Sequence, residues 1–176
     1  GNPLYHWSHL ELLRFFGVEE LLDSQSAPAI WDKANSVLQS PQGTARALIA
    51  SSNVRALCTT DDPADDLQYH KLLAEDRGFA TQVLPTFRPD KILHVENGEY
   101  PVYLQKLGAA AGVYIRTLDD VKAALKQRLD YFAGCGCRLS DQSFGSPDFT
   151  IWDEEAAQEA MRKALDGEAP LDYEVS

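Results

Sequence analysis

The chain has 176 residues, of which 44% are hydrophobic, so it is long enough to bury one sizeable core. Its formal net charge of −11 and its pI of about 4.7 argue against nucleic acids and anionic membranes as partners, because the long-range field repels both. No apolar run approaches the roughly 18 residues that a membrane span needs, and we expect no targeting leader. Three cysteines, Cys58, Cys135 and Cys137, are not spaced like a disulfide framework, which favours a reducing cytoplasm.

The first 53 residues carry helix signals. Ser8 followed by Glu11 three residues later matches a capping box, and Gly17 is placed to end the same helix. Pro28 suits the first turn of a second helix. Helices are therefore predicted over residues 8–17, 26–38 and 44–51.

Three short apolar segments further along predict strands, because each lacks clean alternation and ends in a polar cluster. They span residues 54–58, 79–87 and 135–140. Such strands are typically buried on both faces, so we predict an α/β fold in which helices flank a parallel sheet. We divide the chain into an N-terminal helical region, residues 1–53, and a (β/α) segment, residues 54–176, which together form one compact domain.

Helices alternate with these strands. Asp62 is a good N-cap with Pro63 at the first helical position, and Thr117 with Asp120 caps a later helix. Helices are therefore predicted over residues 62–78, 117–134 and 153–165. Four apolar residues recur at helical spacing in the second of these: Val121, Leu125, Leu129 and Phe132.

Polar clusters follow all three predicted strands. They are Thr59–Asp62, Arg88–Asp90 and Ser140–Gln142. In folds built on a parallel sheet, ligands bind at the carboxyl ends of the strands. We therefore expect the three clusters to share one rim.

Arg88 is the strongest candidate for a binding residue on this rim. Its guanidinium is a planar fork that matches a carboxylate, and Pro89 stiffens the backbone that carries it. The alternative is an ion pair with Asp90 or Asp62 that only ties two loops together. The residues alone thus indicate an anion-binding rim and do not identify the anion.

The other carboxylates of the rim divide between structural and binding roles. Asp62 is expected to cap a helix, whereas Asp61 has no capping role and could contact ligand hydroxyls or Arg88. Asp141 follows a strand and is well suited to capping a turn.

The pattern gives little support to a metal site within the chain. His6 and His9 lie three residues apart without a nearby third ligand. Cys135 and Cys137 are closer than the usual zinc spacing and have no second pair of ligands. No nucleophile elbow, P-loop or dinucleotide fingerprint is present either.

Four stretches, taken together, resemble the uronate isomerases, sugar-acid isomerases of the amidohydrolase superfamily that are also called glucuronate isomerases. They are GNPLYHWSHLELLRFFG, LCTTDDPADDLQYH, VLPTFRPDK and CGCRLSD. The stretches are long, and they occur in the family's order.

The resemblance implies a fold and a reaction. The fold is a (β/α)8 TIM barrel, of which this chain would supply strands two, three and four with an N-terminal helical excursion. The reaction interconverts D-glucuronate with D-fructuronate, and D-galacturonate with D-tagaturonate. The resemblance gives Arg88 the substrate carboxylate, and we expect Asp61, Asp90, Asp141 and Gln142 beside it in the substrate site.

The chain also departs from the family. The family's H-x-H metal pair and its later histidine and aspartate–arginine segments are absent, so no cofactor is expected within this chain, and a divalent metal such as zinc is expected only in the full-length family. Many relatives have S-D-H where this chain has Ser140, Asp141 and Gln142. Gln142 donates hydrogen bonds but does not titrate, so no acid–base role is expected there.

We therefore expect an internal segment of a longer enzyme, inactive by itself. Three adjacent barrel strands cannot close, and their open edges predict self-association into a homo-oligomer. One alternative is a non-catalytic binding domain that keeps the fold and has lost the chemistry. A further alternative is a hydrolase of the amidohydrolase type that acts on another acid.

Overall fold

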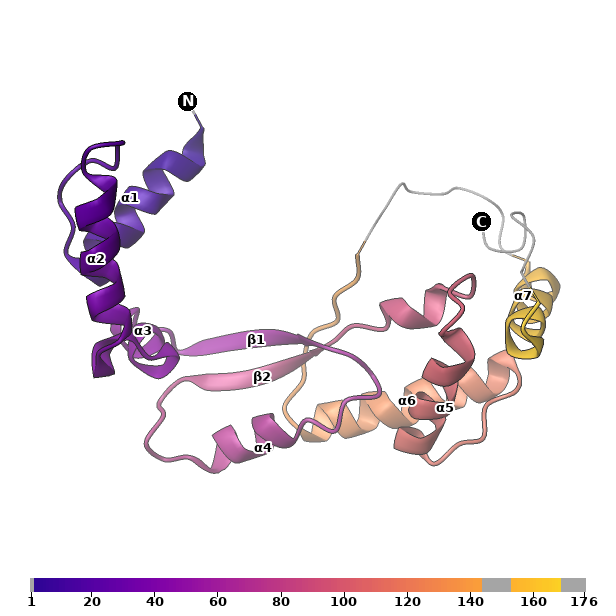
Figure 1. Cartoon of the computed structure of the whole chain (residues 1–176). Coiled ribbons are helices and arrows are strands. Elements are labelled where there is room, and N and C mark those ends of the chain that lie inside the picture. Colours follow the sequence, from indigo (N-terminus) through magenta and orange to yellow (C-terminus); the bar gives the residue numbers. More distant parts are fainter. Residues whose placement is uncertain (1, 144–152, 169–176) are drawn as a thin grey trace. The chain divides into compact units, whose positions relative to one another are not determined.

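The computed structural model describes residues 2–143 and 153–168. The chain divides into two compact units, which we describe separately (Figure 1). The first comprises Gly1–Arg55 with Gly78–Thr81, and the second comprises Ala56–Arg77 with Gln82–Ser176. The sequence placed a boundary after residue 53 and did not anticipate that residues 78–81 belong with the first unit. The expectation of one compact domain overall stays a prediction.

Four helical elements make up the described residues of the first unit. They are α1 (Pro3–Phe16), α2 (Ala27–Leu38), the 3-10 helix η1 (Pro41–Gly43) and α3 (Ala45–Ser51). The helices predicted over residues 26–38 and 44–51 are confirmed, and Thr44 caps the latter by accepting a hydrogen bond from the Ala47 amide.

The first helix begins earlier than predicted. The Asn2 side chain accepts a hydrogen bond from the Leu4 amide at 3.0 Å, and Pro3 occupies the first turn. Ser8 lies inside the helix, where its hydroxyl donates to the Leu4 carbonyl, so the capping box was wrong. The predicted end is confirmed, because Gly17 adopts the left-handed conformation with φ of 62°.

The first unit has a thin core. Among its described residues only four are buried: Val18, Ser26, Ile30 and Thr81. Its large apolar side chains are mostly exposed, including Leu4, Tyr5, Trp7, Leu10, Leu13, Leu21, Trp31 and Leu38. Helix α1 buries no residue completely.

The second unit contains two parallel strands, β1 (Ala56–Asp61) and β2 (Gln82–Phe87), joined by α4 (Gln68–Glu75). They pair in register from Ala56 with Gln82 to Asp61 with Phe87. The predicted parallel pairing and α/β class are confirmed. Along β1, however, exposed and half-buried residues alternate, so this strand is not buried on both faces as expected.

The connection after β1 is a turn and not the first part of a helix. The Asp62 carboxylate accepts from the Ala64 amide at 2.9 Å, and the Asp62 carbonyl accepts from the Asp65 amide at 2.8 Å. Leu67 then adopts a left-handed conformation with φ of 53°, which a helix cannot contain. The helix predicted over residues 62–78 therefore covers only Gln68–Glu75.

The third predicted strand, residues 135–140, is reduced to a single parallel bridge between Phe87 and Ser140. The Phe87 amide donates to the Leu139 carbonyl, and the Asp141 amide donates to the Phe87 carbonyl, both at 3.1 Å. Because backbone groups alternate along a strand, Pro85 faces the same outer edge of β2 as Phe87. Proline has no N–H to donate there, which explains why the pairing does not extend.

Four further elements complete the described part of the second unit. They are η2 (Asp90–Leu93), α5 (Tyr100–Ala111), α6 (Leu118–Gly134) and α7 (Glu154–Asp166). The predicted capping box of α6 is confirmed, because the side chains of Thr117 and Asp120 each accept a hydrogen bond from the other's backbone amide. The predicted helix over residues 153–165 is α7, with Asp153 as its N-cap.

The core of the second unit is dense. One cluster joins α5, α6 and α7 through Leu104, Leu107, Val121, Ala124 and Met161. A second joins Leu67, Phe87, Phe132 and Cys137 beneath the sheet, where α4 and α6 pack against β2. Leu129, expected on the apolar stripe of α6, is exposed.

Arg128 lies in this core on the inner face of α6 and is only 6% exposed. Among the described residues it has no carboxylate partner, and it donates to the carbonyls of Pro63 at 2.6 Å, Asp65 at 2.7 Å and Ala110 at 2.9 Å. Its guanidinium also stacks 4.1 Å from the Tyr131 ring centroid. A buried cation is tolerated here because its donors are matched by carbonyl dipoles.

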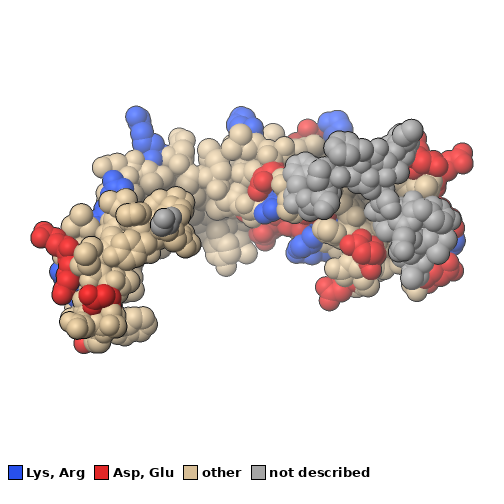
Figure 2. Space-filling model, turned by 90° about the horizontal axis from the view of Figure 1, so that it is seen from above, with Lys and Arg blue, Asp and Glu red and all other residues tan. Residues whose placement is uncertain are grey.

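Charged side chains are spread over the surface. On the face drawn in Figure 2, acidic and basic side chains are interspersed among uncharged ones. No helix within the described residues has both the length and the apolar character that crossing a membrane requires.

Candidate functional site

The structure brings the three predicted polar clusters together at the carboxyl end of the sheet. The Arg88 amide donates to the Asp61 carbonyl at 3.0 Å, which joins the ends of β1 and β2. On the other side, the bridge at Phe87 places Asp141 beside Arg88. The predicted common rim is therefore present in the second unit.

The Arg88 side chain lies on this rim and is 33% exposed. Its Nε donates to Asp90 Oδ2 at 2.8 Å, and its Nη1 lies 3.7 Å from Asp141 Oδ2. Of the two alternative ion pairs considered from the sequence, the one with Asp90 is formed, whereas Asp62 pairs with Lys91. Arg88 is thus held by Asp90 on one edge of its fork and reaches solvent.

Asp90 is held in turn by Ser143, which the sequence did not single out. The Ser143 hydroxyl donates to Asp90 Oδ2, and the Ser143 amide donates to the same oxygen at 3.1 Å. These hydrogen bonds and the nearby Arg88 guanidinium lower the pKa of the Asp90 carboxyl below its ordinary value. Asp90 is therefore an ionised anchor for Arg88.

The Asp61 carboxylate faces α4 and the interior, not the Arg88 side chain. It is 11% exposed and accepts from the Thr59 hydroxyl at 2.6 Å and the Thr86 amide at 3.2 Å. His70 Nε2, on α4, lies 2.7 Å from the same Thr59 hydroxyl. The predicted contact of Asp61 with ligand hydroxyls stays a prediction.

The Asp62 carboxylate is also engaged by neighbouring residues of the fold. Besides capping the turn after β1, its carboxylate accepts from the Tyr103 hydroxyl at 3.2 Å and pairs with Lys91 at 3.1 Å. Burial, together with the Asp62 charge and this hydrogen bond, raises the pKa of Tyr103 well above its ordinary value. Tyr103 is therefore a neutral donor that ties α5 to the end of β1.

Asp141 and Gln142 border the rim on the solvent side. Asp141 is partly exposed and near Arg88, and Gln142 is exposed. Both can present hydrogen-bonding groups to a bound molecule. Their roles as substrate contacts stay predictions.

The histidines and cysteines do not assemble a metal site in the described residues. Residues 2–143 and 153–168 hold no cluster of three or more His, Cys, Asp or Glu side chains suited to a metal ion. Both ring nitrogens of His9 are already engaged, Nδ1 with the Tyr5 carbonyl and Nε2 with the Leu22 amide.

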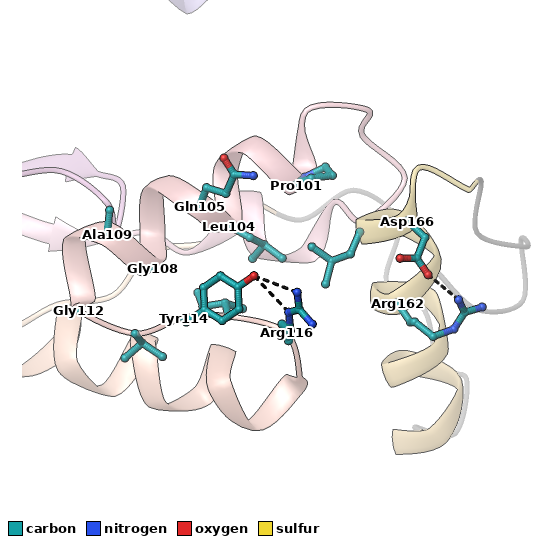
Figure 3. Close-up of a pocket in the computed structure, with 13 residues that line it drawn as sticks. Pro101, Leu104, Gln105, Gly108, Ala109, Gly112, Tyr114, Arg116, Arg162 and Asp166 are labelled. Carbon is teal, nitrogen blue, oxygen red and sulfur yellow. Dashed lines mark hydrogen bonds and ion pairs between the residues drawn. The ribbon is translucent and has the colours of Figure 1, made fainter.

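A separate cavity, about 770 Å³ in volume, lies between α5, α7 and the segment that connects α5 to α6 (Figure 3). Its charged residues satisfy one another or their neighbours: Arg162 pairs with Asp166 at 2.7 Å, and Arg116 donates to the Tyr114 hydroxyl at 3.1 Å. Leu104 and Ile115 supply much of the remaining wall. Of the two arginines in this cavity, Arg162 is therefore already paired with a carboxylate.

Most partners that sequence analysis missed come from distant elements. Ser143, His70 and Tyr103 lie 53, 11 and 41 residues away along the chain from their hydrogen-bond partners. One local signal was available for the Thr59–Asp61 contact, since residues two apart on a strand point to the same face.

Comparison with known proteins identifies relatives. A family model described as glucuronate isomerase matches residues 1–176. The uronate isomerase of Clostridium perfringens is 48% identical over 168 residues, which cover 96% of this chain and 36% of that protein. The uronate isomerase of Caldicellulosiruptor saccharolyticus is 44% identical over 176 residues, which cover 100% of this chain and 38% of that protein.

Solved structures of uronate and glucuronate isomerases share the fold of this chain. The crystal structure of uronate isomerase from Thermotoga maritima superposes with a TM-score of 0.87 at 33% identity, covering 99% of this chain and 38% of that one. A glucuronate isomerase from Caulobacter crescentus shares the fold with a TM-score of 0.85 at 22% identity. The chain spans less than two fifths of the length of these relatives. It belongs to the glucuronate isomerase family and corresponds to a segment of a uronate isomerase.

Proposed function

We propose that this segment supplies the carboxylate-binding arginine, Arg88, of a uronate isomerase. The enzyme would interconvert D-glucuronate with D-fructuronate, and D-galacturonate with D-tagaturonate. The observation that carries the proposal is the position of Arg88 at the joined ends of β1 and β2, anchored through Nε by an ionised Asp90. Family membership supports this function over a non-catalytic binding domain or a hydrolase.

A uronate offers a carboxylate at one end and hydroxyls along its length. A guanidinium whose Nε is taken by Asp90 can meet the carboxylate with its Nη groups. Asp141 and Gln142 lie on the same rim, where carboxylate and amide groups suit sugar hydroxyls. In this proposal Asp90 orients Arg88, and Asp141 and Gln142 contact the sugar.

The isomerisation also needs a base that removes the C2 proton and a donor that stabilises the enediolate before a proton returns to C1. The rim residues described here do not form such a set, because the best-placed carboxylate, Asp90, is engaged by Ser143 and Arg88. We assign the proton transfer to the rest of the enzyme. This chain alone is expected to bind substrate without turning it over.

The fold is proposed to be part of a (β/α)8 barrel of the amidohydrolase superfamily. Two parallel strands connected through α4, with polar groups gathered at their carboxyl ends, support that assignment. Three free cysteines support a cytoplasmic location.

We also propose that the isolated chain self-associates. Within residues 2–143 and 153–168, β1 pairs with β2 along one edge only, and α1 exposes Leu4, Trp7 and Leu10. Light scattering at micromolar concentration is expected to give a mass above 19.5 kDa. A monomeric mass would contradict the proposal.

Arg88 provides the direct test of function. Titration calorimetry with D-glucuronate and D-galacturonate is expected to show binding by the chain that Arg88→Ala abolishes and Arg88→Lys weakens, because lysine lacks the fork. Arg138→Ala, which removes an exposed arginine whose Nη1 donates to backbone carbonyls, serves as the matched control. Equal affinities for Arg88→Ala and wild type would refute the assignment.

Turnover should be followed in parallel, with and without added zinc. Ketose formation by the isolated chain that disappears in Arg88→Ala would show that the working site lies within these residues. That outcome would overturn the assignment of proton transfer to the rest of the enzyme.

A further inference from the structure

The half-buried group formed by Thr59, Asp61 and His70 has no role in the proposed function so far. It lies behind the rim, on the face of β1 that α4 covers. The side chains of Asp61 and His70 are 11% and 12% exposed, so neither is a solvated surface charge. Two half-buried titratable side chains are thus linked through one hydroxyl.

The number of available protons decides which group donates and which accepts in these hydrogen bonds. The Thr59 hydroxyl has one proton and lies 2.6 Å from Asp61 Oδ2, 2.7 Å from His70 Nε2 and 3.4 Å from the Leu84 carbonyl. The carboxylate is the strongest and nearest acceptor, so the hydroxyl proton belongs to that bond. His70 Nε2 must then carry a proton and donate to Thr59. The order is His70 to Thr59 to Asp61.

This series of hydrogen bonds ends at Asp61, which also contacts the backbone of Arg88. The Asp61 carboxylate also accepts the Thr86 amide at 3.2 Å, and the Asp61 carbonyl accepts the Arg88 amide at 3.0 Å. Asp61 therefore holds β2 at both of the backbone amides that flank Phe87. Fixing the Asp61 side chain through Thr59 and His70 fixes the backbone from which Arg88 projects.

We propose that the His70–Thr59–Asp61 network is a positioning device that sets the place and direction of Arg88 for the substrate carboxylate. The proposal rests on the proposed function of Arg88. It gives Asp61 a role behind the rim and makes His70 a donor with its proton on Nε2.

Substitutions at Thr59 separate positioning from folding. Thr59→Val keeps the shape and removes the hydroxyl, Thr59→Ser keeps the hydroxyl, and Thr60→Val is a matched control on the exposed face of the same strand. In the chain at a temperature where all variants are folded, Thr59→Val is expected to weaken D-glucuronate binding roughly tenfold or more. Thr59→Ser and Thr60→Val are expected to bind within about twofold of wild type. Equal binding by Thr59→Val and Thr60→Val would overturn the proposal.

Nuclear magnetic resonance keeps the test independent of uronate binding. The Arg88 Nε–H resonance reports the pairing with Asp90, and it should shift or broaden in Thr59→Val while staying unchanged in Thr59→Ser and Thr60→Val. If wild type binds no uronate, the proposed function fails, and this resonance alone decides the positioning role. An unchanged Arg88 signal in Thr59→Val would refute it.

The ring nitrogens of His70 give a further check. Nitrogen-15 shifts are expected to show a proton on Nε2, and a neutral ring with its proton only on Nδ1 would contradict the order of donors. Should Thr59→Val not fold, His70→Gln, which keeps a donor, and His70→Leu, which does not, repeat the comparison. Equal Arg88 signals in those two variants would also overturn the proposal.

Discussion

The two units of the chain bury their apolar residues very differently. In the first unit, α1 has no fully buried residue, and Trp7 and Trp31 are exposed. In the second unit, Leu107 and Phe132 are completely buried. Both units contain helices with side-chain N-caps, α1 and α3 in the first and α6 and α7 in the second, so the difference lies in tertiary packing. The comparison teaches that the unit carrying the rim has its own apolar core, whereas the described residues of the helical unit leave most of their large apolar side chains exposed.

The largest expected effect tests this contrast in core packing. Phe132→Ala removes a ring that packs edge-on against Phe87 at 5.2 Å, and it should lower the free energy of unfolding of the second unit by about 3–5 kcal/mol. Leu10→Ala on α1 should change the free energy of unfolding of the first unit by less than about 0.5 kcal/mol. Amide hydrogen exchange can follow each unit separately. Comparable losses in both units would break the comparison.

Arg128 provides the next largest effect. Arg128→Met keeps much of the volume but leaves the carbonyls of Pro63, Asp65 and Ala110 without these donors, so we expect a loss of about 3 kcal/mol in urea unfolding. Arg162→Met, on the surface of α7, should have a far smaller effect because its ion pairs are solvated. If the two substitutions cost the same, the buried arginine is not a determinant of the second unit.

Helix caps should give a smaller effect. Thr117→Ala removes the reciprocal capping box of α6 and is expected to cost about 1 kcal/mol. Asn2→Ala removes the cap of α1 and should fray that helix, seen as faster amide exchange in its first turn, with no change in the second unit. Faster exchange in the second unit after Asn2→Ala would mean that the units are coupled.

The smallest expected effect is the pH dependence of the folding stability that the Asp90 carboxylate contributes. Its pKa is lowered below the ordinary value of 3.8, first by the Ser143 hydroxyl and then by the Ser143 amide and Arg88. Because the folded pKa lies below the unfolded one, the carboxylate stabilises the fold above the unfolded pKa, and this contribution is lost as pH falls through the folded pKa.

Urea unfolding of wild type and Asp90→Asn tests this sign. The stability difference between them should shrink as pH falls from the ordinary aspartate range toward the lowered folded pKa, since Asp90 then becomes neutral like the asparagine. A difference that stays constant over that range would show that Asp90 is not preferentially ionised in the folded chain.

The sequence predicted best those features that depend on a few neighbouring residues. Thr117 with Asp120, Gly17 and Thr44 marked helix ends correctly, because capping is a local interaction. A local signal can also mislead. Ser8 with Glu11 predicted a helix start, but the helix begins at Pro3 with Asn2 as its N-cap, and Ser8 lies inside it.

Non-local interactions account for the remaining errors. Arg128 looks like a surface residue in its own helix, and its carbonyl partners lie 18 to 65 residues away along the chain. The predicted rim at Arg88 and Asp141 formed because parallel topology alone brings strand ends together. The hydrogen bonds behind it, from His70 and Ser143, depend on how helices and loops return to the sheet.

Pro85 has a consequence for how the isolated chain can polymerise. A strand added along the outer edge of β2 would meet a position without an amide donor, so growth in that direction is opposed. The outer edge of β1, which carries the alternate backbone groups of Ala56, Cys58 and Thr60, has no proline. Any strand-mediated assembly of this segment should therefore be one-sided, with β1 as the growing edge, so a proline introduced at Cys58 would be the natural means to stop it.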